Sequence, residues 1–124
     1  MKYYSVSVTE THGWIMYVGS EALFRWLTDY LDDRVPGLRE QTLREAQNAV
    51  YLYLPDLPRA AYLRTLEVLG RDAPAAAAEV VPSLIQYRAP GTSHQEQVVS
   101  VLGEVKTLAL IARNTLAVGD VTQS

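Results

Sequence analysis

Polar and apolar residues alternate over the first stretch of the chain, which reads "YYSVSVTETHGWIMYVG" from Tyr3 to Gly19. The alternating segments are rich in β-branched and aromatic residues, and a short segment with a glycine interrupts them. This pattern predicts a β-hairpin whose strands cover about 2–10 and 14–19.

Two registers of this hairpin compete. A two-residue loop at 12–13 would mix polar and apolar side chains on both faces of the hairpin. A three-residue loop at 11–13 pairs Val6 with Val18 and collects the apolar side chains on one face. It also places Gly13 in the left-handed conformation that a type I turn with a G1 bulge requires. We favour this second register, in which three side chains point away from the core face: Tyr3, Ile15 and Tyr17.

A helical periodicity follows the predicted hairpin. Ser20 is a favourable capping residue for a helix over about 21–33, and the segment "VPGL" terminates that helix. A second helix is predicted over about 38–54, although its tail "AVYLYL" also fits a strand. The segment "PDLP" separates it from a third helix at about 57–69, which stops at Gly70.

The last third of the chain predicts two more helical segments. "DAPAAAAEVVPSLIQY" begins as a helix that Pro82 must break or kink. Residues 83–88 then form either a short helix or an extra strand beside the hairpin. Ser93 and Glu96 have the spacing of a capping box and predict the start of a long helix that ends at Gly119.

These elements together predict the fold class and the domain organisation. We expect an α+β fold that is mainly helical, with the N-terminal β-hairpin packed on about five helices. We also expect the 124 residues to form one compact domain over 1–124, because this length allows a core without disulfides and the chain has no cysteine. Inside the last helix, Gly103 favours a close contact with another helix.

Both the excess of negative charge and most of the aromatic residues lie near the N-terminus. The chain has a formal net charge of −3, and residues 1–33 hold five acidic residues against two basic ones. The same segment contains seven of the eleven aromatic residues. An acidic chain without a basic stripe disfavours direct binding to nucleic acid. Since no apolar run is long enough for a signal peptide or a membrane span, we expect a soluble cytoplasmic protein.

Candidate catalytic chemistry is sparse. The two histidines, His12 and His94, do not have the spacing of metal ligands. Ser93, His94 and Glu96 have the residue types of a catalytic triad and are close in sequence. Neighbouring residues at the start of a helix point apart, however, and the capping box accounts for the serine and the glutamate. We therefore predict no catalytic residue, no metal, no cofactor and no enzymatic activity.

The helix predicted over about 21–33 ends in an unusual way. Three aspartates crowd its last turn, where the helix dipole favours cations. On a helical wheel its apolar arc covers about 200°, more than one packed face needs, and Trp26 lies at the margin of the arc beside Asp33. A large aromatic side chain rimmed by carboxylates resembles a protein-interface hot spot. The predicted partner-binding residues are Ile15, Tyr17, Trp26, Asp29, Asp32 and Asp33.

The first functional hypothesis is a non-catalytic protein that neutralises a basic protein partner. Immunity proteins and antitoxin-type inhibitors of bacterial toxins belong to this functional class. An acidic surface attracts a basic target and accelerates the encounter. Under this hypothesis, the combined substitutions Asp29→Asn and Asp33→Asn raise stability and weaken partner binding, because the aspartates serve recognition at the expense of the helix.

Two alternative functions stay open. One is a small enzyme or small-ligand binder with a helical pocket lined by tyrosines, namely Tyr30, Tyr51, Tyr53 and Tyr62. The other is a homo-oligomeric assembly subunit that uses the outward residues and the free edge of the hairpin.

Overall fold

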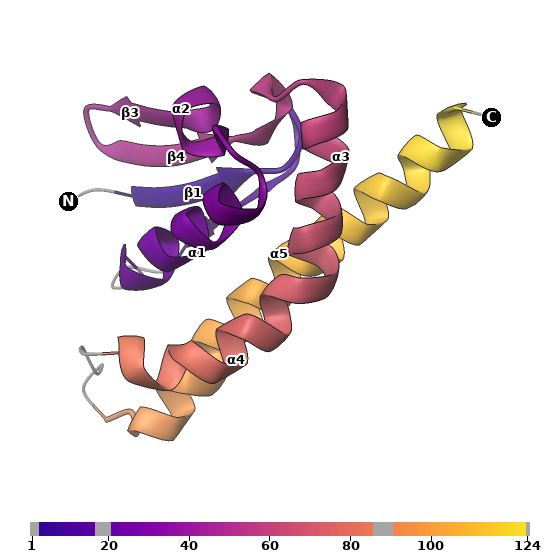
Figure 1. Cartoon of the computed structure of the whole chain (residues 1–124). Coiled ribbons are helices and arrows are strands. Elements are labelled where there is room, and N and C mark those ends of the chain that lie inside the picture. Colours follow the sequence, from indigo (N-terminus) through magenta and orange to yellow (C-terminus); the bar gives the residue numbers. More distant parts are fainter. Residues whose placement is uncertain (1–2, 17–20, 86–90, 124) are drawn as a thin grey trace.

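The fold is α+β and mainly helical, as the sequence predicted (Figure 1). The computed structural model describes residues 3–16, 21–85 and 91–123. In chain order the elements are β1 (Tyr3–Ser7), β2 (Gly13–Met16), α1 (Glu21–Arg34), α2 (Leu38–Thr42), β3 (Leu43–Ala46), β4 (Ala49–Tyr53), a 3-10 turn η1 (Leu54–Asp56), α3 (Arg59–Glu67), a π-helical turn η2 (Val68–Asp72), α4 (Ala73–Leu84) and α5 (His94–Gln123).

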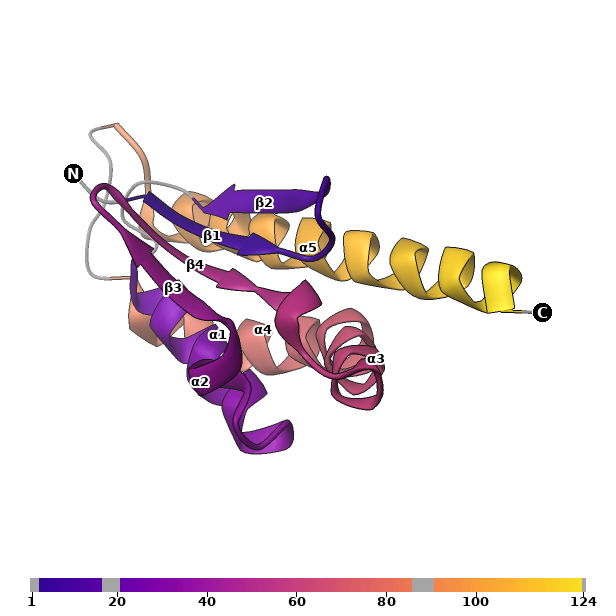
Figure 2. The ribbon, with the colours of Figure 1, turned by 90° about the horizontal axis from the view of Figure 1, so that it is seen from above.

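The described strands form one four-stranded sheet in the order β2-β1-β4-β3. β1 is antiparallel to β2 and parallel to β4, and β3 is antiparallel to β4. Val6 of β1 is paired with Leu52 of β4, and both side chains are fully buried. Since side chains alternate along a strand, this pair marks the core face of the sheet. Helices α1 and α2 lie against that face (Figure 2).

The N-terminal hairpin exists, but both predicted registers are wrong. Val6 is paired with Trp14 instead of Val18, and Ser7 is paired with Gly13. The loop is longer than predicted because Thr9 and His12 close it with their own hydrogen bonds. The backbone N–H groups of Val8 and Thr9 both donate to the carbonyl of His12, at 2.9 Å each. The backbone N–H of His12 donates to Thr9 Oγ1, also at 2.9 Å.

Gly13 is required in this hairpin for a different reason from the predicted one. Its φ is not positive, so the predicted left-handed conformation is wrong. Instead, a Cβ atom at this position would lie 2.5 Å from the carbonyl oxygen of Val6 and 2.9 Å from Cα of Ser7. The two strands therefore approach each other too closely for any side chain at Gly13.

A second β-hairpin replaces most of the helix predicted over about 38–54. Helix α2 ends at Thr42, and residues 43–53 form β3 and β4. The alternative for the tail "AVYLYL", a strand, is confirmed by β4. Val50 and Leu52 alternate with half-buried Tyr51 and Tyr53, which is the pattern of a strand with one core face.

Residues 83–88 were predicted to form either a short helix or an extra strand beside the hairpin. Residues 83 and 84 are helical and belong to the last turn of α4, and the strand that pairs with the other edge of β1 is β4. Residues 86–88 lie outside the described residues, as does the predicted cap Ser20. Pro82 does not break α4 before its end, since the helix continues to Leu84.

The third predicted helix does not stop at Gly70. α3 passes through the π-helical turn η2 into α4, and Gly70 lies in the middle of that turn. Nη1 of Arg113 on α5 donates a hydrogen bond to the carbonyl of Gly70, at 2.9 Å. A Cβ atom at Gly70 would lie 2.8 Å from Cγ of Arg113. Gly70 is therefore the glycine of a close contact, and the same expectation for Gly103 is wrong, because a Cβ there would meet no heavy atom within 4 Å.

The capping box at the start of α5 is confirmed. The backbone N–H of Glu96 donates to Oγ of Ser93 at 3.1 Å, and the backbone N–H of Ser93 donates to Oε2 of Glu96 at 3.4 Å. α5 extends to Gln123 and therefore continues past Gly119, where the sequence predicted its end. It packs along α4, η2 and α3 and buries its own apolar face against them, including Val101, Val105, Leu108 and Ala112 (Figures 1 and 2).

Candidate functional site

The surface of α1 carries a stacked row of three side chains. Trp26 and Tyr30 are half-buried, and their ring centroids are 5.0 Å apart with an interplanar angle of 31°. The guanidinium carbon of Arg34 lies 3.5 Å from the centroid of the Tyr30 ring, and Nη1 of Arg34 donates to the carbonyl of Tyr30 at 3.2 Å. The three residues are one helical turn apart, which brings their side chains together on one face. We call Trp26, Tyr30 and Arg34 the α1 ladder.

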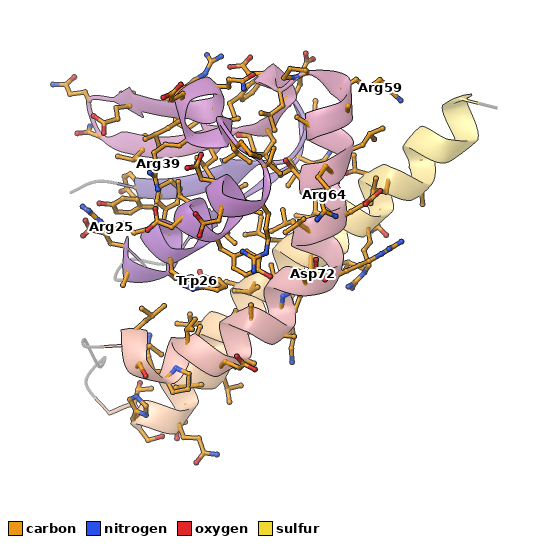
Figure 3. All side chains as sticks on the ribbon, viewed as in Figure 1. Arg25, Trp26, Arg39, Arg59, Arg64 and Asp72 are labelled. Carbon is orange, nitrogen blue, oxygen red and sulfur yellow. The ribbon has the colours of Figure 1, made fainter. Side chains whose placement is uncertain are left out.

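The wide apolar arc of α1 is explained by its neighbours. Leu23, Phe24, Leu27 and Leu31 are fully or almost fully buried. They pack between the sheet and α2 on one side and α4 with η2 on the other. Trp26 lies at the edge of this buried arc, packed against the core but partly exposed (Figure 3).

Two of the three aspartates at the end of α1 have partners in α2. Asp29 forms an ion pair with the side chain of Arg39, and Oδ1 of Asp32 accepts a hydrogen bond from the backbone N–H of Arg39 at 2.9 Å. The N–H groups at the start of a helix lack partners within the helix and attract negative charge. The carboxylates are thus unfavourable for α1 but favourable for α2, whose first turn lies against them.

Asp33 differs from the other two aspartates. It is exposed and makes no ion pair or hydrogen bond with the residues that the structure describes. On α1 it lies beside Trp26 on the helical wheel, so its charge stays available at the edge of the α1 ladder. Of the predicted acidic residues, Asp33 is the one whose charge is open to a partner.

The six predicted partner-binding residues do not share one face. Trp26, Asp29, Asp32 and Asp33 all belong to α1, which contacts the core face of the sheet through Phe24 and Tyr4, whose ring centroids are 5.2 Å apart. Ile15 is paired with Ser5, whose position is on the opposite face of β1 from Tyr4. Tyr17 lies outside the described residues.

The tyrosines proposed to line a helical pocket lie on three different elements. Tyr51 and Tyr53 are on strand β4, on its face away from the core. The hydroxyl of Tyr62 on α3 donates to the carbonyl of Val8 at 2.8 Å, and Tyr30 belongs to the α1 ladder. Because β4 is a strand, its tyrosines are directed away from the helices instead of lining a pocket between them.

Sequence reasoning missed a groove between α1, α2 and the sheet. It has a volume of about 430 Å³, and its residues are Tyr4, Phe24, Arg25, Thr28, Asp29, Arg39, Leu43, Glu45 and Val50. Arg25 forms a salt bridge of 2.6 Å with Glu21, and Arg39 pairs with Asp29 (Figure 3). The groove is large enough for a small molecule or a partner side chain, but its two cations are already balanced by carboxylates.

The pKa values of Tyr4 and Arg25 in this groove are both raised, in part by the neighbouring Glu21. Burial raises the pKa of the Tyr4 hydroxyl, and the hydrogen bond and negative charge of Glu21 raise it further. The hydrogen bond and charge of Glu21 also raise the pKa of Arg25. Both groups therefore stay protonated at neutral pH, and neither can act as a general base there.

The two histidines are held in separate local networks. Nδ1 of His12 lies 2.9 Å from Oγ1 of Thr11 within the exposed loop between β1 and β2. Nε2 of His94 lies 3.1 Å from the carbonyl of Pro82. Among the described residues, no group of three or more histidines, cysteines or carboxylates could hold a metal ion.

No protein-family model, curated protein or solved structure matches this chain. The features of this chain that bear on function are therefore the α1 ladder and its surroundings. Of the helices that the structure describes, none has the length and apolar character needed to cross a membrane.

Proposed function

We propose that this protein is a non-catalytic binding protein of the cytoplasm that neutralises a basic protein partner, as immunity proteins and antitoxin-type inhibitors do with bacterial toxins. The observation that carries the proposal is the α1 ladder, in which a partly exposed tryptophan packs against Tyr30 and Arg34 stacks on the same tyrosine. Interface hot spots are rich in tryptophan, tyrosine and arginine. A side chain that is already ordered loses little entropy when a partner binds.

The charge around the ladder supports a basic partner. Residues 21–42, which include α1 and α2, contain five acidic residues and three arginines, so this segment carries most of the net charge of −3. Asp29 and Asp32 are compensated locally by α2, whereas Asp33 is exposed beside the ladder. We assign the role of anchor to Trp26 and the role of electrostatic steering to Asp33.

The test begins with capture of the partner and then measures neutralisation. The wild-type protein is immobilised, the retained basic protein is identified by mass spectrometry, and its toxic or enzymatic activity is measured with and without this chain. We expect the wild type to suppress that activity. Trp26→Ala should weaken binding by at least about thirtyfold, the loss typical of a hot-spot residue.

Asp33→Asn provides a second variant that does not disturb packing. It should slow association several-fold at low salt and reduce the dependence of the association rate on ionic strength. The matched control is Glu79→Gln, which removes one exposed carboxylate from α4. The proposal is wrong if Trp26→Ala, shown to be folded by circular dichroism, binds as tightly as the wild type, or if Glu79→Gln weakens binding as much as Asp33→Asn.

A further inference from the structure

Helix α5 has an exposed face as well as a buried one. Val99 and Leu110 are 64% and 51% exposed, and a Cβ atom at Gly103 would point into open space. The charged residues on the same side, Glu96, Lys106 and Arg113, are also exposed. At about 100° per residue, this side lies roughly 160° from the buried face of the helix. We call the six residues Glu96, Val99, Gly103, Lys106, Leu110 and Arg113 the α5 stripe.

The residues of the α5 stripe are spaced alternately three and four apart, which is the spacing of the a and d positions of a coiled coil. In an antiparallel pair of identical helices, each a position faces a d position of the other helix, and a twofold axis makes every contact occur twice. With the axis between Glu104 and Val105, Val99 faces Leu110 of the second copy and Gly103 faces Lys106. The same axis sets Glu96 opposite Arg113.

We propose that two copies of this chain associate through the α5 stripe as an antiparallel helix pair. All three layers of this register are complementary. Val99 and Leu110 form an apolar layer, and Glu96 lies opposite the positive charge of Arg113. Gly103 leaves room for the aliphatic part of the Lys106 side chain. A parallel pair would instead set Glu96, Lys106 and Arg113 each against its own copy, so the charges select the antiparallel arrangement.

Arg113 is ordered before the second copy binds. Its Nη1 donates to the carbonyl of Gly70 at 2.9 Å, and its Cγ packs against the same residue. The remaining guanidinium N–H groups can donate to Glu96 of the second copy while this hydrogen bond is kept. Ordering in advance lowers the entropic cost of the ion pair. The stripe spans about 26 Å of helix, so we expect a small interface and dissociation in the micromolar range.

The mass of the protein in solution tests the association. Sedimentation equilibrium of the full chain, from low micromolar to near-millimolar concentration, should show a shift from 13.8 kDa towards twice that mass. Leu110→Glu should remain monomeric at every concentration, because it buries an unpaired charge against Val99. Val118→Glu is the matched control, since Val118 is 63% exposed on the same helix but lies outside the stripe. A wild-type monomer at the highest concentration, or loss of the dimer in Val118→Glu but not in Leu110→Glu, would overturn the proposal.

Charge exchange tests the antiparallel register. Glu96→Arg and Arg113→Glu, each alone, place like charges in both outer layers and should weaken self-association at least tenfold. An equimolar mixture of the two variants should form heterodimers with an affinity close to that of the wild type, because each outer layer then holds opposite charges. The double variant in one chain should likewise recover the homodimer, although it lacks both the native capping carboxylate and the native arginine. Single variants that dimerise like the wild type would exclude this register.

Discussion

Asp32 in the last turn of α1 accepts a hydrogen bond from the backbone N–H of Arg39 in the first turn of α2, at 2.9 Å. The turn between the two helices contains Gly37, whose φ of 83° lies in the left-handed region. This turn brings the start of α2 back against the end of α1. A carboxylate that opposes the dipole of its own helix thereby satisfies the free N–H of the next one.

Asp32 and Asp33 should therefore have opposite effects on stability. Asp32→Ala removes the acceptor for α2 and should lower the free energy of unfolding by about 1 kcal/mol, as the loss of a helix cap does. Asp33→Asn removes an unpaired charge from the C-terminal turn of α1 and should raise the same free energy by about 0.3 kcal/mol. Urea unfolding of the two variants measures both changes.

The combined substitution of Asp29 and Asp33 by asparagine should raise the free energy of unfolding less than Asp33→Asn alone. Asp29 pairs with Arg39, but both side chains are substantially exposed, so the pair contributes at most a few tenths of a kcal/mol. Its loss offsets part of the gain expected from Asp33→Asn. Equal stabilisation by Asp29→Asn and Asp33→Asn, measured separately, would contradict the assignment of different roles to these residues.

Local sequence patterns predicted the elements that local interactions determine. The capping box of Ser93 and Glu96 uses residues three positions apart, and the bounds of α1 follow from its own periodicity. The sequence did not decide between helix and strand for the segment that forms β4. This strand pairs in parallel with β1, which is more than forty residues away in sequence. The turn between β3 and β4 contains Gln47 and Asn48 without a glycine, so the sequence lacked the usual hairpin signal.

The two glycines at helical positions should respond differently to a methyl group. Gly103→Ala places Cβ in open space and should stabilise the monomer by about 0.5–1 kcal/mol through helix propensity. Gly70→Ala places Cβ 2.8 Å from Cγ of Arg113 and should destabilise the protein by about 1 kcal/mol or more. Thermal unfolding at low protein concentration, where the chain is monomeric, compares them. Destabilisation by Gly103→Ala would show that α5 has a neighbour at this position.

The candidate site was predictable only in part, because its organisation depends on contacts between elements. Periodicity placed Trp26 at the margin of the buried arc of α1, where the structure also has it. The partner of Asp29 and Asp32 is seven to ten residues away and reaches them only after α2 folds back. The sequence does contain one local signal of the ladder, the spacing of four residues between Trp26, Tyr30 and Arg34.

The stacking of Arg34 on Tyr30 should be measurable apart from the charge of Arg34. Arg34→Ala should lower the free energy of unfolding by about 0.5–1 kcal/mol, because it removes the cation over the ring and a favourable charge at the end of α1. Arg34→Lys keeps the charge but loses the planar group, so it should recover only part of this loss. Chemical denaturation of both variants in low salt distinguishes the two contributions. Full recovery by lysine would mean that stacking contributes nothing.

Tyr62 should make stability depend on alkaline pH. Burial raises the pKa of its hydroxyl above 10.0, and the hydroxyl donates to the carbonyl of Val8 at 2.8 Å. The folded state therefore retains the proton at a pH at which the unfolded chain loses it. The contribution of this group is complete below pH 10 and disappears as the pH rises through the folded-state pKa. Tyr62→Phe should lower the free energy of unfolding at pH 8 by about 1 kcal/mol and make the decline above pH 10 less steep. Urea unfolding of both proteins between pH 8 and 11 measures this difference, and equal slopes on the alkaline side would contradict the assignment.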